Sequence, residues 1–259
     1  MRCLFRDGVQ LACEDAGGGE PALLCIHGNS CNHEFFRPQI EHFKKTRRVV
    51  ALDLRGHGHS DAPNQAYTFA GLADDCAWVC QELGLGQVAL LAHSMGGAVA
   101  AEMIKAHPGL VRAVALLDST LLPDTATLQK VLPPLINDLE GRDHLQGMRE
   151  FVGPLFAPGD SPELREWIWQ EMRRTPAHVT NALFEEFLGW RDSATTHITQ
   201  PFLYVASFHW RSDPAALARA CPQVQTTQIK QSGHFLTLSA ADRINALVGD
   251  FLERVAGNK

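Results

Sequence analysis

Five short runs of this chain are apolar from end to end, and segments of helical periodicity separate them. The runs span residues 22–26, 49–52, 88–92, 113–117 and 202–206. A strand that is apolar throughout is buried on both faces, as happens when helices cover both sides of a parallel sheet. At the N-terminus, residues 2–5 and 9–14 flank Asp7-Gly8, a pair typical of an antiparallel hairpin. The sequence therefore predicts an α/β fold with right-handed strand–helix–strand crossovers.

The strand pattern is interrupted between two of these runs, where helix-period segments and aromatic side chains replace it. We predict a helical cap at residues 121–198, inserted into a core formed by 1–120 and 199–259. An insertion above the carboxyl edge of a parallel sheet would roof any site there. Four cap residues are candidates for substrate-binding pocket walls, although packing between cap helices explains each of them equally well: Trp167, Trp169, Phe184 and Trp190.

The composition is that of an ordinary globular protein and argues against several kinds of partner. The chain has 259 residues and a formal net charge of −6, so it lacks the basic footprint of a nucleic-acid-binding protein. No apolar run approaches the roughly 20 residues that cross a bilayer, and no signal-peptide core is visible. Seven scattered cysteines indicate free thiols in a reducing compartment. We expect a cytoplasmic monomer or homodimer that binds neither nucleic acid, nor membrane, nor metal.

The strongest chemical signal is Ala92-His93-Ser94-Met95-Gly96, directly after an apolar run and directly before a helical pattern. Small residues two before and two after a serine allow a tight, strained turn that lifts its hydroxyl above the sheet. The start of the following helix offers backbone N–H groups and a positive dipole to an oxyanion. We interpret Ser94 as a nucleophile; the alternative is an ordinary capping serine in a glycine-rich turn.

A nucleophilic serine needs a general base, and the chain has twelve histidines that could serve. His234 lies in Ser232-Gly233-His234-Phe235, a loop just before the C-terminal helical pattern, and histidine has the pKa that a base needs. The competing histidines are His57, His59 and His209.

The turn His27-Gly28-Asn29-Ser30 follows an earlier apolar run, at the same predicted edge of the sheet. Because the carboxyl ends of parallel strands meet at that edge, the backbone N–H of Asn29 would face the serine turn. A plain post-strand turn that uses Gly28 and Asn29 is the alternative.

Taken in order, the His27-Gly28 turn, the segment 53–60, the turn around Ser94 and the Gly233-His234 turn resemble the α/β-hydrolase superfamily. The pattern is similar to the esterase and lactonase branch typified by pimeloyl-carrier-protein methyl ester esterase. The resemblance implies a mostly parallel eight-stranded sheet with helices on both faces and an inserted helical cap. It also implies Ser94 as nucleophile, His234 as base, and an oxyanion hole from the backbone N–H groups of Asn29 and Met95. Dehalogenases of this fold carry aspartate where this chain has Ser94.

The carboxylate that would contact His234 does not lie where the α/β-hydrolase pattern usually has it. Many relatives place it after the strand that follows the cap, where this chain has Trp210. Asp118, at the end of the apolar run 113–117, is our preferred acid, and some relatives place theirs at this point. Asp213 is the alternative, although Asp213-Pro214 also reads as the start of a helix. The acid must reach the His234 ring to hold its tautomer.

These residues favour a serine hydrolase that cleaves a carboxylic ester, thioester or lactone through an acyl-enzyme on Ser94, without a cofactor. The apolar cap suggests a small-molecule substrate with an apolar portion. A cofactor-independent lyase or dioxygenase on the same scaffold, a C–C bond hydrolase and a non-catalytic ligand receptor are the alternatives.

Overall fold

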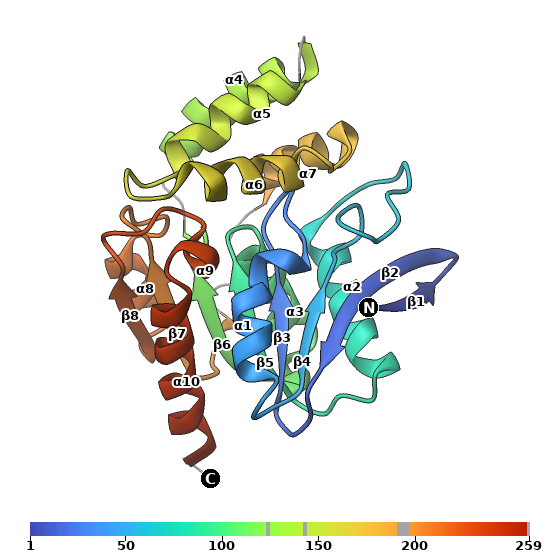
Figure 1. Ribbon diagram of the computed structural model, residues 1–259, viewed down its shortest axis with the longest axis vertical. Coiled ribbons are helices and arrows are strands. Elements are labelled where there is room, and N and C mark those ends of the chain that lie inside the picture. The colour runs from blue at the N-terminus through green and yellow to red at the C-terminus, as the bar shows by residue number, and fades with distance from the viewer. Residues whose placement is uncertain (123–124, 142–143, 191–196, 258–259) are drawn as a thin grey trace.

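The computed structural model describes residues 1–122, 125–141, 144–190 and 197–257, and in these ranges eight strands form one sheet (Figure 1). Its order is β1-β2-β4-β3-β5-β6-β7-β8. The strands are β1 (Arg2–Arg6), β2 (Val9–Ala16), β3 (Ala22–Ile26), β4 (Val49–Leu52), β5 (Val88–His93), β6 (Val111–Leu117), β7 (Phe202–Ala206) and β8 (Val224–Gln228). Strands β1, β2 and β4 pair antiparallel and the others parallel, so the predicted α/β fold and its N-terminal hairpin are confirmed.

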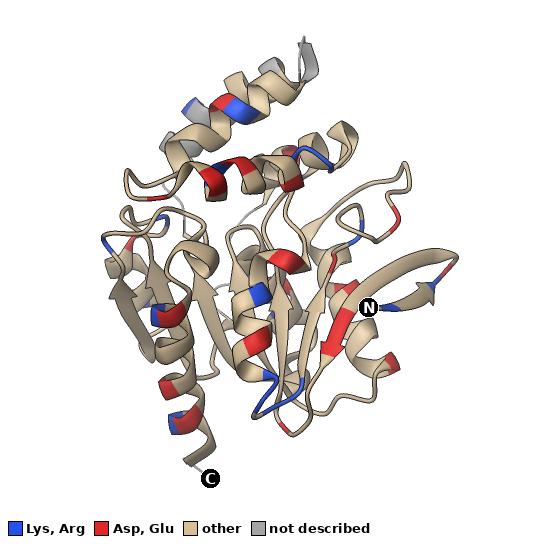
Figure 2. Ribbon diagram, in the orientation of Figure 1, with Lys and Arg blue, Asp and Glu red and all other residues tan. Residues whose placement is uncertain are grey.

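Helices cover both faces of the sheet and explain its apolar strands. One face packs against α1 (Arg37–Phe43), α9 (Leu236–Ser239) and α10 (Ala241–Gly257), and the other against α2 (Phe69–Glu82), α3 (Gly96–Ala106) and α8 (Pro214–Ala220). In β3, Leu24 and Ile26 point into one core, whereas Leu23 and Cys25 point into the other. Figure 2 shows the charged residues gathered on helices and loops, away from the central strands.

Between β6 and β7 the chain forms α4 (Thr125–Gly141), α5 (His144–Val152), α6 (Pro162–Met172) and α7 (Ala177–Gly189), with no strand among the residues described there. These four helices, with the turn Gly153–Leu155 between α5 and α6, are called the cap below and stack over one edge of the sheet (Figure 1). The apolar core of the cap includes Phe35 and Phe235 of the sheet domain. Of the predicted ranges, residues 123–124, 142–143, 191–196 and 258–259 lie outside the described residues.

The seven cysteines are free thiols, and six of them are buried. Cys76 and Cys80 belong to the core between α2 and the sheet, so their four-residue spacing reflects packing on one helix face. Within the described ranges, no helix combines the length and the apolar character needed to span a bilayer.

Candidate active site

Ser94 stands on a sharp turn between β5 and α3. Its φ angle is 54°, in the region that non-glycine residues rarely adopt, and its N–H donates to the carbonyl of Leu117 at 3.0 Å. A side chain on Gly96 would overlap the carbonyl of Ile26, and a Cβ on Gly28 would lie 2.9 Å from that of Ser94. These close approaches explain why small residues surround Ser94. Such residues are those that a tight, strained turn requires.

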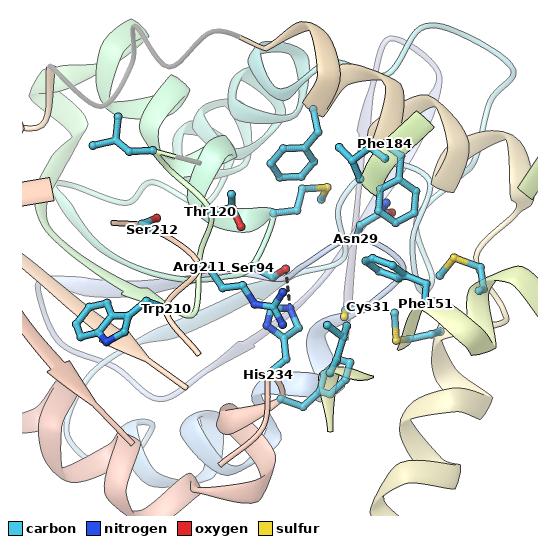
Figure 3. A pocket seen from close by; sticks show the side chains of 18 of the residues that line it. Asn29, Cys31, Ser94, Thr120, Phe151, Phe184, Trp210, Arg211, Ser212 and His234 are labelled. Atoms are coloured by element: carbon cyan, nitrogen blue, oxygen red, sulfur yellow. Dashed lines mark hydrogen bonds between the residues drawn. The ribbon is translucent and has the colours of Figure 1, made fainter. Parts of the chain in front are cut away.

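The structure brings Ser94, His234 and Asp118 together in one hydrogen-bonded chain. The Ser94 Oγ lies 2.9 Å from His234 Nε2, and the two side chains point toward each other in Figure 3. The other ring nitrogen, Nδ1, lies 2.6 Å from Asp118 Oδ2. Because a carboxylate only accepts hydrogen bonds, Nδ1 carries the proton and Nε2 is free to accept the proton of the serine hydroxyl.

Asp118 follows β6 and is fully buried. Its Oδ1 accepts a hydrogen bond of 2.8 Å from the Ser207 N–H, and the Arg211 Nε lies 3.4 Å from Oδ2. Burial alone would raise the pKa of Asp118, but His234 and then Arg211 hold it below its usual range, so the group is ionised. Asp118 is therefore the carboxylate that reaches the His234 ring.

Asp213, the alternative acid, makes its hydrogen bond at the start of α8. The Oδ1 of Asp213 accepts a 2.9 Å hydrogen bond from the Ala215 N–H, so this side chain caps α8, and it also lines the cavity described below. At the position where the family resemblance places the acid, Trp210 stacks on Tyr204 with ring centroids 5.9 Å apart. The loop after β7 thus contributes an aromatic wall and a helix cap, but no carboxylate in contact with His234.

His93 supports His234, a contact that the sequence did not indicate. Its Nε2 donates to the carbonyl of His234 at 2.8 Å, and the two rings lie 4.7 Å apart. Burial lowers the pKa of His93 to about 3, so the ring is neutral at physiological pH. The His234 N–H in turn donates to the carbonyl of Leu155 in the cap. The position of His93, inside the serine turn and next to Ser94, was the available signal.

The competing histidines have partners other than Ser94. The His57 Nδ1 contacts the carbonyl of Arg55, His59 contacts Asp53, and the exposed His209 packs on Phe208. Of the four candidates, His234 is the one in contact with Ser94.

The turn after β3 lies beside Ser94, where Asn29 and Met95 both border the cavity. His27 holds this turn: its Nε2 accepts from the Leu54 N–H at 3.0 Å, so its Nδ1 donates to the Gly28 carbonyl at 2.8 Å. The Asn29 side chain donates to the Thr180 carbonyl of the cap at 3.3 Å. Both segments that carry the predicted oxyanion donors therefore adjoin Ser94.

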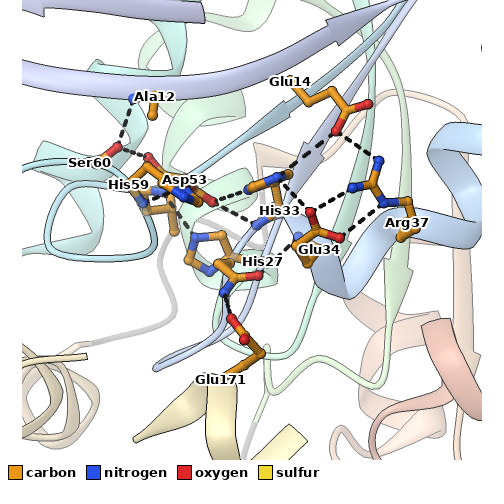
Figure 4. A network of polar contacts seen from close by, with 12 residues as sticks. Ala12, Glu14, His27, His33, Glu34, Arg37, Asp53, His59, Ser60 and Glu171 are labelled. Atoms are coloured by element: carbon orange, nitrogen blue, oxygen red, sulfur yellow. Dashed lines mark hydrogen bonds and ion pairs between the residues drawn. The ribbon is translucent and has the colours of Figure 1, made fainter. Parts of the chain in front are cut away.

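A buried ionic network fixes the segment that follows this turn (Figure 4). The Oδ1 of Asp53 accepts from the backbone N–H of His33 at 2.7 Å and from its Nδ1 at 2.8 Å, while Oδ2 accepts from the His59 N–H at 2.9 Å. Burial opposes ionisation of both groups, yet His33 lowers the pKa of Asp53 to about 2 and Asp53 raises the pKa of His33. The attraction between the two side chains therefore favours the ionised form of Asp53 and the protonated form of His33.

Within the described residues, His33, Asp53 and His59 also place three possible metal-ligand atoms within 4.8 Å of one another. Both Asp53 oxygens already accept N–H donors, so hydrogen bonding accounts for this cluster without an ion. We assign it the structural role of tying β4 to the 27–33 segment.

A cavity of about 510 Å³ opens above Ser94 and His234, between the sheet edge and the cap. Figure 3 shows Thr120, Arg211 and Ser212 on one side of Ser94 and Phe151 and Phe184 on the other. The further apolar residues of the lining come mostly from the cap: Cys31, Leu122, Leu132, Met148, Leu155, Met172, Phe187 and Phe235. The cavity thus has a polar end and an apolar end.

One of the four aromatic residues predicted as pocket walls borders this cavity, namely Phe184. The other three do not line it. Trp167 packs on Phe35 at the surface, Trp169 lies in the cap core beneath Arg149, and Trp190 donates a 2.8 Å hydrogen bond to Glu102 on α3. They join helices to one another, which is the alternative that the sequence left open.

Comparison with known proteins agrees with this geometry. A strand-end serine in contact with a histidine and a buried carboxylate is the arrangement of serine hydrolases. The family model of the alpha/beta hydrolase fold matches residues 21–241, so the chain belongs to that family and is a hydrolase, as its sequence predicts.

Individual relatives match over nearly the whole chain. The AB hydrolase superfamily protein YisY of Bacillus subtilis is 29% identical over 262 residues, covering 94% of this chain and 95% of that protein. A thermophilic esterase from Thermogutta terrifontis, solved with malate bound, is 26% identical with a TM-score of 0.86, over 95% and 94% of the two chains. The esterase from Exiguobacterium antarcticum, at 22% identity and a TM-score of 0.87 over 95% and 97%, has the same fold.

Replacing Asp53 tests the network of Figure 4. Asp53→Asn removes the carboxylate shared by the N–H donors of His33 and His59 and replaces one oxygen by an NH2 group that cannot accept, so the free energy of unfolding at pH 7 should fall by about 1–3 kcal/mol. The contribution of an acid with a depressed pKa is complete above its ordinary value of 3.8 and is lost as the pH falls through about 2. The difference between wild type and variant in urea denaturation should therefore shrink on acidification in that window.

Asp74→Asn is the matched control, because Asp74 is an exposed residue of α2 whose ion pair with His107 lies at the surface. It should change stability little. An Asp53→Asn protein as stable as this control would contradict the role given to the network.

Proposed function

We propose that this protein is a serine hydrolase that cleaves carboxylic esters, with thioesters and lactones in the same class, through an acyl-enzyme on Ser94. The observation that carries the proposal is the hydrogen-bonded chain from Ser94 through His234 to Asp118 at the base of the cavity. The likeness to the Thermogutta terrifontis esterase supports it.

In the proposed reaction, the Ser94 Oγ attacks the carbonyl carbon while His234 Nε2 takes its proton. The negative charge on the carbonyl oxygen is stabilised by the backbone N–H groups of Asn29 and Met95. The intermediate then collapses, the C–O bond breaks, and His234 returns the proton to the departing alcohol. Water repeats the sequence on the acyl-enzyme, releasing the acid and restoring Ser94. Asp118 stays ionised throughout and holds the imidazole tautomer.

The cap is proposed to select the substrate rather than to perform chemistry. Met148, Phe151, Leu155 and Phe184 supply apolar surface around the cavity, while Ser94 and His234 come from the sheet domain. A substrate with an apolar portion would gain roughly 25 cal/mol for each Å² of apolar surface that it buries there.

Labelling tests the nucleophile. A fluorophosphonate should modify the wild-type protein at Ser94, and Ser94→Ala should abolish labelling and lower kcat for a short p-nitrophenyl ester by as much as about 10⁶. His234→Gln should have a similarly severe effect, whereas His209→Gln, at an exposed histidine, should not. Ester cleavage that survives in Ser94→Ala would contradict the assignment. Wild-type protein that is neither labelled nor active on esters would favour the lyase, dioxygenase or receptor alternatives.

A pair of amide substitutions tests the acid. Asp118→Asn should lower kcat about 10⁴-fold, because the amide presents the wrong partner to His234 Nδ1 and disfavours the productive tautomer. Asp213→Asn should cost little, because asparagine caps a helix as well as aspartate does. Steady-state kinetics on one ester compares the two variants, and the reverse order of effects would transfer the acid role to Asp213.

The pH dependence tests the state of the base. Burial and, less strongly, Arg211 lower the pKa of His234, against the opposing effect of Asp118. Because the neutral imidazole is the active form, kcat/KM should rise with pH and reach half its plateau below the ordinary histidine value of 6.5. A midpoint above 6.5 for a neutral ester would show that Asp118 outweighs burial.

A further inference from the structure

Arg211 is the one lysine or arginine among the described residues that line the cavity. It lies in the loop after β7, and Figure 3 shows its side chain extending toward His234 and Ser94. Its side chain lines the cavity and is 29% exposed, so it is not closed off by the residues around it. The proposed mechanism gives this cation no part.

The contact of Arg211 with Asp118 leaves most of its guanidinium free. In the described part of the chain, the hydrogen bond and ion pair of Arg211 both use Nε, at a long 3.4 Å. Asp118 is already satisfied by closer partners, His234 at 2.6 Å and the Ser207 N–H at 2.8 Å. A guanidinium has five N–H donors, and the four on the two Nη atoms form the pair that binds a carboxylate side by side.

The other charged side chain at this end of the cavity does not neutralise Arg211. The carboxylate of Asp213 is directed to the start of α8 by its hydrogen bond with the Ala215 N–H. The ion pair of Arg211 is instead made with Asp118, whose charge is shared with the base. An incoming anion would therefore meet a cation that is held in place but not fully paired.

The position of the cation also affects the base. The charged groups that face His234 are Asp118 after β6 and Arg211 after β7, while His93 at the end of β5 is neutral. Arg211 weakens His234 as a base, since a nearby positive charge disfavours the imidazolium. An anion bound to Arg211 would cancel this effect at the moment when the substrate is in place.

We propose that Arg211 binds a carboxylate of the substrate, so that the preferred substrate is an ester or lactone that also carries a free carboxylate. This inference rests on the function proposed above and adds a substrate class to it. The apolar portion of the same molecule lies toward Phe151 and Phe184, and the carboxylate lies toward Thr120 and Ser212.

Paired substrates test the inference. Methyl hydrogen glutarate and methyl 5-oxohexanoate have similar shapes, but only the first is anionic. The methyl hemiesters of succinate and adipate place the carboxylate closer to the ester group and farther from it. Butyryloxyacetate carries its carboxylate on the alcohol part of the ester, and its primary amide is the neutral match. The ratio of kcat/KM, anionic over neutral, should exceed one in at least one pair. It should fall about 10- to 100-fold in Arg211→Gln, the loss expected for charge-assisted hydrogen bonds, and less in Arg211→Lys.

Arg219→Gln is the control, because it removes the same charge from an exposed position on α8 outside the cavity lining. This variant should keep the wild-type ratio. A readout independent of turnover is calorimetric binding of the hemiesters to Ser94→Ala, which should weaken by a similar factor when Arg211→Gln is added.

The pH profile distinguishes anion binding from a merely structural ion pair. In wild type, the acid limb of kcat should lie at higher pH for the anionic substrate than for its neutral match, because the bound carboxylate cancels the effect of Arg211 on His234. This difference should vanish in Arg211→Gln.

The outcomes separate the two proposals. If the protein hydrolyses neutral esters but neither pair shows an Arg211-dependent preference, the carboxylate site is overturned and the hydrolase proposal stands. If Ser94 is not labelled and no ester is cleaved, the hydrolase proposal fails. Binding of the hemiesters to Ser94→Ala that depends on Arg211 would then still support the anion site. If such binding is absent, the anion site is overturned as well.

Discussion

The hydrogen bond between Asp118 and His234 joins residues 116 positions apart, and the site depends on it. It forms because β6 ends beside β5 at the carboxyl edge, while the C-terminal chain crosses back over that edge before α10. The contact is buried, so the carboxylate is desolvated and must be compensated by His234, by the Ser207 N–H and by Arg211. The pairing of β5 with β6 therefore places Asp118 near Ser94, and the returning C-terminal chain brings His234 into contact with both.

Most of the fold was predictable because its strands are buried on both faces. Such runs are apolar throughout, and they stand out against helical segments without knowledge of their partners. The last strand, β8, lies at the sheet edge and reads Val-Gln-Thr-Thr-Gln, with a mostly exposed or half-buried pattern. Residue pattern alone did not reveal it, and the count of eight came from the family resemblance.

The site was predictable where local backbone geometry dictates residue type. The turn around Ser94 needs small neighbours, and Asp118 ends a strand beside it. The cap tryptophans were not predictable in the same way, because helical periodicity shows that a side chain is buried but not which surface covers it. Trp169 faces the cap core and Trp190 faces α3, and these contacts depend on tertiary packing. The support of the base by His93 is likewise a long-range contact.

Placing the acid after β6 has a consequence for how this enzyme could diversify. The loop after β7 does not supply the carboxylate that contacts His234. Trp210, Ser212 and Asp213 of this loop border the cavity but do not contact the side chains of Ser94, His234 or Asp118, whereas Arg211 both borders the cavity and contacts Asp118. Mutational drift or laboratory evolution can therefore change Trp210, Ser212 or Asp213 to alter which molecules are accepted, while the hydrogen-bonded chain from Ser94 to Asp118 stays on other strand ends.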